Sequence, residues 1–371
     1  MPLVPLSAVR YLAPWLRPLR ALAARRWLRE AEIDGLLALL NPTWRLNRVF
    51  ARVQGRRWVA DDMLALTLQP NGNWRGARPG QHVRLYLEVA GVRLSRSYSL
   101  TALHADGSLE IAIKRQPGGR LSNRLLDWVA VGQVLEIGQP FGELCWVEQA
   151  PGVLLLAAGS GLTPLLGLLR GALAQGFGAP VTLLHYVRRH GQRAFVHELQ
   201  ALQAQHANLR VRWALSGDPA QAGELSGRFA AEHLHELGDV ERRSVFACGP
   251  AGFVEQVQGW WHGAPRDGQL QVETFSPPAF NQAEPVRPVR LRFARAQREV
   301  QGDSRRSLLE QAEAEGLRPA HGCRQGICAS CTCLLLSGAV RDLRSGALFS
   351  EPNQPIRLCV SAPQGDVAVD V

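Results

Sequence analysis

The sequence is poor in lysine, and cysteine is missing from most of its length. Lys114 is the single lysine, so the formal net charge of +10 comes almost entirely from arginine. No cysteine precedes Cys145, and five of the seven cysteines lie between positions 323 and 359. This crowding and the odd total exclude a disulfide framework spread over a secreted fold. They favour a reducing, cytosolic setting.

Long uncharged hydrophobic runs are also scarce. The apolar N-terminus is interrupted before the core of a signal peptide can form, by Arg10, Arg17, Arg20, Arg25 and Arg26. We therefore expect no signal peptide. The uncharged run from Ala150 to Leu169 is long enough to suggest a membrane span, but a glycine turn interrupts its middle. We predict a buried strand, a turn and the start of an apolar helix there.

Periodicity divides the 371 residues into five segments, enough for three domains. Residues 1–44 are rich in leucine, tryptophan and arginine, and predict either a helix that caps the next domain or a basic amphipathic segment that touches a membrane. Residues 45–149 hold short β runs and predict an antiparallel barrel. Residues 150–275 alternate strands with helices, which predicts a doubly wound parallel sheet. The proline-rich residues 276–288 suggest a linker before a small domain over residues 289–371.

The cysteine run in the last domain is the most specific motif. Cys323, Cys328 and Cys331 are spaced C-x4-C-x2-C, and Cys359 follows much later. This is the ligand spacing of a plant-type [2Fe–2S] cluster, which four thiolates hold. A structural zinc site with four cysteines is the alternative, and the spacing argues against it. Cys333 is left over, and we expect it to be a packed thiol.

Two segments of the predicted barrel have the chemistry of a flavin site. In the first, Arg96 can neutralise a phosphate, Tyr98 can stack on a ring, and Ser99 offers a hydroxyl to a ring nitrogen. In the second, residues 113–123 form a strand and a glycine turn, with Ser122 placed to begin a helix. Backbone N–H groups at such a turn bind anions. A hairpin turn with a capped helix is the alternative, but the two segments together favour a flavin pyrophosphate site.

Two glycine turns in the predicted parallel sheet indicate a nucleotide site. The turn from Gly159 to Pro164 and the turn from Cys248 to Phe253 each follow a buried strand. Both should lie at the carboxyl edge of the sheet, where glycines let a pyrophosphate approach the backbone. Taken alone, Cys248 is equally well explained as a small buried hydrophobic residue.

Arginines near this edge bear on the choice of nucleotide. Arg188 and Arg189 follow a strand, as does Arg193, and an arginine here can accept a 2′-phosphate. On this rule we favour NADPH and keep NADH as an alternative. Arg188 and Arg189 can also be read as solvated surface charges.

The order of these motifs resembles the ferredoxin–NADP reductase superfamily, in the form with a C-terminal plant-type ferredoxin domain. The resemblance covers residues 45–371. It implies an FAD-binding antiparallel barrel, a doubly wound α/β domain for NAD(P) and an α+β ferredoxin domain of the β-grasp type. Members include reductases of oxygenases, of phenylacetyl-CoA-type epoxidases and of membrane fatty-acid desaturases. In this superfamily a serine and an arginine follow the next strand, whereas Ser216 is followed here by Gly217.

The resemblance also implies roles for residues of this chain. Ser99 and Cys248 are the catalytic candidates beside the hydride path. The residues expected to hold FAD are Arg96, Ser97, Tyr98, Ser99, Ile113, Lys114, Gly119, Leu121, Ser122 and Phe275. Those expected to hold the nicotinamide nucleotide are Gly159, Ser160, Gly161, Leu162, Thr163, Pro164, Arg188, Arg189, Cys248, Gly249 and Pro250. The expected iron ligands are Cys323, Cys328, Cys331 and Cys359.

The resemblance implies an NAD(P)H oxidoreductase that passes electrons through FAD and the cluster to a protein acceptor. The acceptor is expected to be an oxygenase component or a membrane fatty-acid desaturase, and a soluble aromatic-ring oxygenase is the alternative. We expect a cytoplasmic protein, with peripheral contact at the inner face of the membrane through residues 1–40 as an option. A redox-sensing iron–sulfur flavoprotein is the alternative of a different class. We expect no nucleic-acid partner, because the sequence shows no helix-turn-helix or base-reading module.

Overall fold

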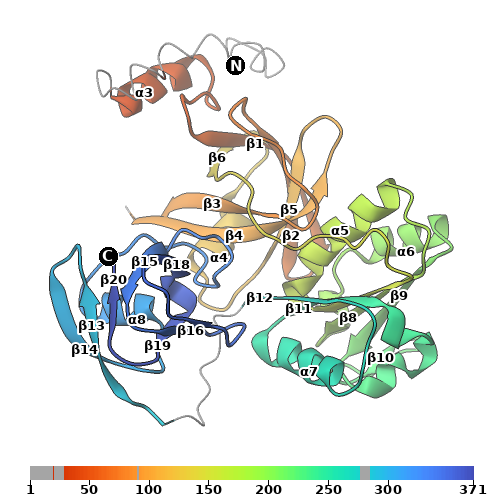
Figure 1. The fold of residues 1–371 in the computed structure, drawn as a ribbon. Helices are drawn as coiled ribbons and strands as arrows, with labels where there is room; N and C mark the ends of the chain where they lie inside the picture. The colour runs from red at the N-terminus through yellow and green to blue at the C-terminus, as the bar shows by residue number, and fades with distance from the viewer. Residues whose placement is uncertain (1–19, 21–28, 90–91, 276–284) are drawn as a thin grey trace. The chain divides into compact units, whose positions relative to one another are not determined.

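A computed structural model describes residue 20 and residues 29–89, 92–275 and 285–371 (Figure 1). The chain divides into two compact units. The first extends to Gly249 and includes Phe253–Glu273, and the second consists of Thr274–Val371 with Pro250–Gly252. Most of the predicted N-terminal segment of residues 1–44 lies outside the described residues before Arg29, apart from Arg20, as does most of the predicted linker.

The first part of unit one is a closed six-stranded barrel with the strand order β1-β2-β5-β4-β3-β6. Every pair of neighbouring strands is antiparallel, and alternate apolar side chains fill the interior. The predicted antiparallel barrel is therefore confirmed. Its strands are β1 (Val49–Ala60), β2 (Met63–Pro70), β3 (His82–Val89), β4 (Val92–Leu103), β5 (Leu109–Lys114) and β6 (Val134–Ile137).

In the part of the chain that the structure describes, two helices accompany the barrel. Helix α3 (Glu30–Leu40) is tied to it by Asp34, whose carboxylate accepts the Leu46 N–H at 2.6 Å and pairs with Arg48 at 3.0 Å. Helix α4 (Arg120–Trp128) follows β5 and packs Leu121, Leu125 and Leu126 into the barrel core.

The second part of unit one is a six-stranded sheet with the order β10-β9-β8-β7-β11-β12. The neighbours from β10 to β11 are parallel, and the chain leaves β7 toward β8 but returns on the other side at β11. This reversal confirms a doubly wound sheet with its switch point between β7 and β11. The strands are β7 (Val153–Ala158), β8 (Val181–Val187), β9 (Leu209–Leu215), β10 (Leu225–Ser226), β11 (Ser244–Gly249) and β12 (Leu270–Thr274).

The helices of this sheet are α5 (Leu162–Ala174), α6 (Val196–Gln205) and α7 (Ala251–His262), with short 3₁₀ turns η2 (Gly159–Gly161), η3 (His190–Gln192), η4 (Ala231–Leu237) and η5 (Val240–Arg242). The run Ala150–Leu169 contains β7, η2 and the start of α5, as its glycine turn predicts. Among the described residues, no helix has the length and hydropathy needed to cross a bilayer.

The C-terminal domain is α+β, as expected for a β-grasp. Its main sheet has the order β14-β13-β20-β15-β18, with β13 and β20 parallel, and a smaller sheet has the order β17-β16-β19. The strands are β13 (Pro288–Phe293), β14 (Arg298–Asp303), β15 (Thr332–Ser337), β16 (Val340–Asp342), β17 (Leu348–Phe349), β18 (Gln354–Arg357), β19 (Ser361–Pro363) and β20 (Val367–Val369). Helix α8 (Leu308–Ala314) begins with a capping box between Ser307 and Glu310, and the turn η6 (Leu358–Val360) follows β18.

Candidate functional site

The segment expected to bind the flavin ring lies on β4. Arg96 is exposed, and its Nη1 donates to the Ser95 carbonyl at 2.7 Å. Tyr98 packs against the barrel core, and burial raises the pKa of its phenol above the ordinary value. The Tyr98 hydroxyl therefore stays protonated at neutral pH.

The serines of this segment carry buried hydroxyls. The Oγ atoms of Ser97 and Ser99 have no hydrogen-bond partner within the described protein. Buried polar atoms in native proteins are normally paired, so this strand fits a ligand with hydrogen-bonding atoms at both positions. A flavin meets that requirement.

The β5–α4 connection has the geometry of an anion site. Gly118 has φ +67°, and a Cβ placed on Gly119 would lie 2.3 Å from the Ser122 Oγ. The N-terminus of α4 follows at once, and its first turn holds no acidic residue. Ile113 and Leu121 are buried in the barrel core, so these two predicted contacts are limited to their main-chain atoms.

The two predicted nucleotide turns meet at the switch point of the sheet. Gly159 has φ +55°, and a Cβ on Gly161 would lie 1.9 Å from the Cys248 carbonyl oxygen. Only glycine therefore lets the turn after β7 lie against the end of β11. Thr163 closes the turn by donating its hydroxyl to the Ser160 carbonyl at 3.0 Å. Leu162 is fully buried, so it too offers only its main chain.

The barrel reaches this turn through Lys114, at the end of β5. The Lys114 Nζ would lie 3.4 Å from a Cβ on Gly159, and it pairs with Asp62 at 3.6 Å. The single lysine of the chain thus brings a positive charge to the place where both sequence motifs predict a phosphate. This arrangement connects the predicted flavin and nucleotide segments within one compact unit.

A buried histidine, which the sequence analysis did not single out, supports the same turn. His185 on β8 is fully buried, and its Nε2 lies 3.0 Å from the Gly159 carbonyl. Burial lowers the pKa of His185 to about 4, although the bond to Gly159 opposes the shift. The ring is therefore neutral at pH 7, and Nε2 carries the proton that it donates to Gly159.

Cys248 is buried at the end of β11. Burial and the nearby Glu273 raise the pKa of its thiol, so that it stays protonated. Glu273 on β12 is itself only 8% exposed, and its Oε1 lies 3.0 Å from the His82 Nε2. His82 is paired in register with Ser99 across β3 and β4. Glu273 therefore pairs with His82, Cys248 lies near Glu273, and Ser99 lies opposite His82 on the neighbouring strand.

The sequence analysis named Cys248 and Ser99 but missed Glu273 and His82. Glu273 could have been noticed in the sequence as a charged side chain in a short β run, two positions before Phe275. Phe275 and Pro250 fall in the second unit, and the Phe275 carbonyl accepts from the Gln325 Nε2 at 2.5 Å. A flavin contact of Phe275 and a nucleotide contact of Pro250 stay predictions.

The arginines expected at a 2′-phosphate lie beyond β8. Arg188 and Arg189 are exposed. Arg193 already pairs with Glu224 at 2.5 Å, and Asp218 accepts the main-chain N–H of His190 at 2.8 Å. This edge of the parallel sheet therefore holds two kinds of charged group. The arginines favour the 2′-phosphate of NADPH, and the carboxylates favour the free 2′-hydroxyl of NADH.

The four predicted iron ligands lie in one loop and the turn η6. The loop has left-handed backbone at Arg324 (φ +58°), Gly326 (φ +73°) and Ala329 (φ +53°). These turns direct main-chain N–H groups at sulfur: the N–H of Cys323 donates to the Cys328 Sγ at 3.2 Å, and the N–H of Gln325 donates to the Cys323 Sγ at 3.4 Å. Non-glycine residues rarely adopt this conformation, so the loop is built around its thiols.

The thiols are arranged as two pairs. Cys323 and Cys328 share hydrogen bonds, and the Sγ atoms of Cys331 and Cys359 lie 3.2 Å apart. No group of three or more potential ligands surrounds a single point among the described residues. Two pairs match a dinuclear cluster with two thiolates per iron better than one zinc ion with four. Hydrogen bonding to Cys323 lowers the pKa of Cys328 to about 4, which favours the thiolate that a metal binds.

Comparison with families of known proteins matches three consecutive parts of the chain. Residues 51–146 match the oxidoreductase FAD-binding domain, residues 155–259 the oxidoreductase NAD-binding domain, and residues 292–364 the 2Fe-2S iron-sulfur cluster binding domain. These matches coincide with the barrel, the doubly wound sheet and the cysteine loop, in the order that the motifs predict.

Individual relatives agree with this division. An NADPH oxidoreductase of Mycobacterium tuberculosis is 32% identical over 346 residues, which cover 91% of this chain and 88% of the relative. The ferredoxin–NAD(+) reductase component of the alkene monooxygenase system of Xanthobacter autotrophicus is 36% identical over 59% of this chain and 66% of its own length. Phthalate dioxygenase reductase has a similar fold, with a TM-score of 0.56, 24% identity and coverage of 87% of this chain and 97% of that one.

Proposed function

Because the chain belongs to the ferredoxin reductase family with a C-terminal 2Fe-2S domain, we propose that it is the reductase component of an oxygenase system. It is an NAD(P)H oxidoreductase of the iron–sulfur flavoprotein type. FAD supplies a two-electron hydride acceptor when bound, and the cluster supplies a one-electron carrier. The acceptor protein would take electrons one at a time.

The observation that carries this proposal is the approach of Lys114 to Gly159. It brings the end of a barrel strand, beside the predicted flavin pyrophosphate turn, against the predicted nicotinamide turn. Hydride transfer requires the donor and acceptor carbons to be held about 3–3.5 Å apart, and such a junction can hold them. In the proposed site, the protonated Cys248 thiol and the Ser99 hydroxyl lie beside the reacting rings, and Glu273 holds His82 next to them.

An anaerobic titration with NADPH, followed by visible absorption and electron paramagnetic resonance, tests the proposal. We expect flavin bleaching together with the signal of a one-electron-reduced [2Fe–2S] cluster. A purified chain without flavin would overturn the proposal. Fast NADPH oxidation with an artificial acceptor would also separate a reductase from a redox sensor, since a sensor needs no rapid turnover.

We propose NADPH rather than NADH as the donor. Arg188 and Arg189 are exposed at the end of β8, and the Mycobacterium tuberculosis relative is an NADPH oxidoreductase. Replacing both arginines by glutamine should lower kcat/KM for NADPH about 10-fold and leave that for NADH unchanged. Equal losses with both nucleotides would contradict a 2′-phosphate site.

A membrane fatty-acid desaturase is the second candidate acceptor. Leu36 and Leu39 on α3 are 67% and 79% exposed, and the 29 residues before Glu30 carry six arginines and no acidic side chain. A basic segment with exposed leucines suits an anionic lipid surface. Binding to vesicles of anionic lipid should fall when Leu36 and Leu39 are replaced by serine and residues 1–28 are removed. Unchanged binding would exclude this contact and leave a soluble oxygenase component.

A further inference from the structure

The nucleotide-binding domain lies directly on the barrel along α5. A Cβ on Gly167 would lie 2.1 Å from the Leu100 carbonyl oxygen, and a Cβ on Gly171 would lie 2.5 Å from the Cγ of Pro79. The two glycines are four residues apart and therefore share one face of the helix. At Gly167 the backbone of α5 consequently lies directly against the backbone of β4, and at Gly171 it lies against the Pro79 ring. We call this junction of α5 and α6 with β1, β4 and β5 the seam.

One arginine of α5 bonds three other elements at the seam. The Arg170 Nη1 donates to the Thr101 carbonyl on β4 at 2.6 Å and to Glu110 on β5 at 3.0 Å. Its Nε donates to Glu198 on α6 at 2.8 Å. The guanidinium plane thus fixes α5 against two barrel strands at once, which a lysine could not do with the same geometry.

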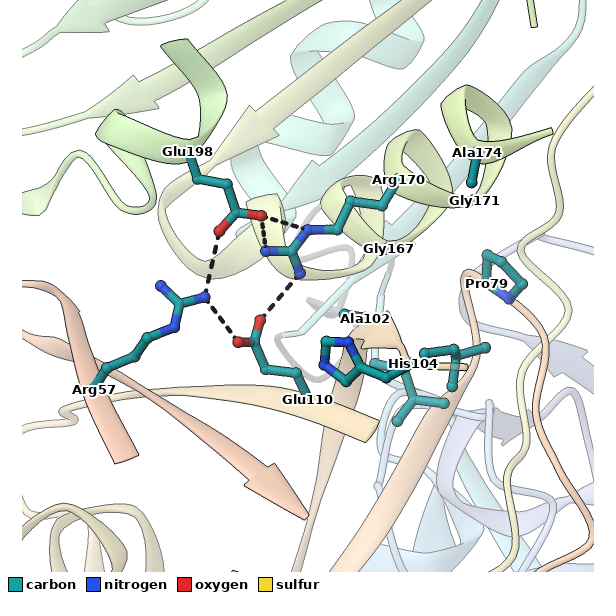
Figure 2. Close-up of a pocket in the computed structure, with 12 residues that line it drawn as sticks. Arg57, Pro79, Ala102, His104, Glu110, Gly167, Arg170, Gly171, Ala174 and Glu198 are labelled. Atoms are coloured by element: carbon teal, nitrogen blue, oxygen red, sulfur yellow. Dashed lines mark hydrogen bonds and ion pairs between the residues drawn. The ribbon is translucent and has the colours of Figure 1, made fainter. Parts of the chain in front are cut away.

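Glu110 is the centre of this arrangement. Its carboxylate is 4% exposed and accepts from the Thr101 hydroxyl at 2.7 Å, from Arg170 and from Arg57 at 2.8 Å. Arg57 also reaches Glu198 at 3.3 Å, which closes a ring of alternating charges (Figure 2). Burial raises the pKa of Glu110, but Arg170, Thr101 and Arg57 outweigh it and hold this pKa below the ordinary range.

A strained residue is held at the same place. Phe195 is the N-cap residue of α6 and has φ +58°, and its N–H donates to the Val59 carbonyl of β1 at 2.9 Å. The guanidinium carbons of Arg57 and Arg170 each lie 5.3 Å from the centre of its ring. A phenylalanine in left-handed backbone persists only where its surroundings fix it. The charged ring therefore determines local backbone as well as side-chain positions.

Apolar packing does not fill this part of the seam. A cavity of about 370 Å³ lies beside the charged ring, lined in part by Pro79, Leu103 and His104. Replacing a buried ion pair by apolar residues is often neutral for stability, so stability alone is a weak reason for such a network. The ring also fixes the position of α5 against β4 and β5, and this is the stronger reason for such a network.

We infer that Glu110 is a positioning residue for hydride transfer, acting through Arg170 and Thr101 on the placement of α5 against β4. The inference rests on the proposed function, because it needs nicotinamide and flavin to be the reacting pair. Strand β4 carries Ser99 immediately before Leu100, and α5 begins immediately after the turn that ends at Gly161. Any shift at the seam therefore moves the two predicted binding segments relative to each other. A displacement of about 1 Å can slow such a step about 100-fold.

The test is the reduction of the flavin by NADPH in E110Q, measured by anaerobic stopped-flow absorption with the full chain. Glutamine has nearly the same shape and keeps the bond to Thr101, but it removes the charge that Arg57 and Arg170 share. We expect the limiting rate of flavin bleaching to fall about 10-fold. The apparent Kd for NADPH and the FAD content should stay near those of the wild type. With NADPH deuterated at the transferred position, the isotope effect on bleaching should be at least as large as in the wild type.

The matched control is D34N, because Asp34 is also a buried carboxylate paired with an arginine, but it lies on α3, away from the seam. It should reduce its flavin at the wild-type rate. G167A is a second seam variant, and it should slow bleaching in the same way without removing any charge. The inference is overturned if E110Q and G167A bleach at the wild-type rate, or if D34N slows as much as they do. A wild-type chain whose flavin neither NADPH nor NADH reduces would overturn the proposed function itself.

Discussion

The cysteine loop and the seam hold their groups in opposite ways. In the loop, three left-handed residues lie within the nine residues from Cys323 to Cys331, and they direct main-chain N–H groups at sulfur. In the seam, Arg57 and Glu198 meet although 141 positions separate them. The conformation of the loop is determined by its own backbone. The seam, in contrast, forms only when two domains have folded and docked.

Replacing Cys328 by serine should abolish the cluster and transfer to a one-electron acceptor, because one iron loses a thiolate. Flavin reduction by NADPH should continue, since the ligand loop and the seam belong to different compact units. Iron content, paramagnetic resonance and stopped-flow bleaching measure the three quantities. C333S is the control, because Cys333 is a half-buried packed thiol, and it should keep its iron. If NADPH no longer reduced the flavin of C328S, the cysteine loop and the seam would not act independently.

Acid should weaken the nucleotide turn through His185. Its pKa is near 4 in the folded chain and 6.5 ordinarily, so the unfolded chain binds the extra proton between these values. The free energy of unfolding should therefore fall as the pH drops from 6.5 to 4, by about 3 kcal/mol in total. Denaturant unfolding of H185Q, whose amide can still donate to Gly159, should show a smaller fall. The exposed His262 provides the control H262Q, and an identical fall in H185Q and the wild type would refute this account.

Alanine at Gly161 should push the two nucleotide turns apart, because its Cβ would lie 1.9 Å from the Cys248 oxygen. We expect kcat/KM for NADPH to fall about 100-fold, with FAD and iron contents unchanged. Steady-state kinetics with an artificial acceptor measure the loss. G259A serves as the control, because a Cβ at that helix position meets nothing within 4 Å. Wild-type kinetics in G161A would mean that the turns do not cradle the nucleotide.

Lysine at Arg170 should have the mildest effect. It keeps the charge beside Glu110 but cannot bond Thr101 and Glu198 at the same time. The limiting rate of flavin reduction should fall about threefold, a smaller loss than in E110Q. R93K is the matched control, since Arg93 pairs with Glu136 on the exposed barrel surface. A rate below that of E110Q would show that Arg170, and not the carboxylate, fixes the seam.

The sequence predicted the features whose signals are local. The spacing of Cys323, Cys328 and Cys331 indicated the cluster, and the glycines from Gly159 to Gly161 indicated the nucleotide turn. Strand runs separated by turns indicated the barrel and the parallel sheet. Each of these patterns is complete within a few residues, because a metal loop or a phosphate turn is a local backbone structure.

The sequence did not predict the contacts that join distant segments. Glu110 reads as one charged residue in an apolar strand, and Arg170 reads as the one charged residue of an apolar helix. Their pairing depends on how α5 docks on β4, which no spacing in the chain encodes. The same reason explains why Glu273 and His82 were missed: each became informative only when β12 and β3 were placed together.

The glycine contact of α5 with β4 bears on how such chains can be recombined. The predicted domain boundary near residue 149 separates two sequence patterns, but Gly167 and Leu100 on either side of it fit each other atom to atom. A hybrid protein joined at this boundary would combine α5 of one relative with β4 of another. Any side chain at position 167 would then prevent the helix from fitting against the strand. When domains are exchanged between relatives, the barrel and the nucleotide domain should therefore be transferred together. The junction should be placed after residue 275.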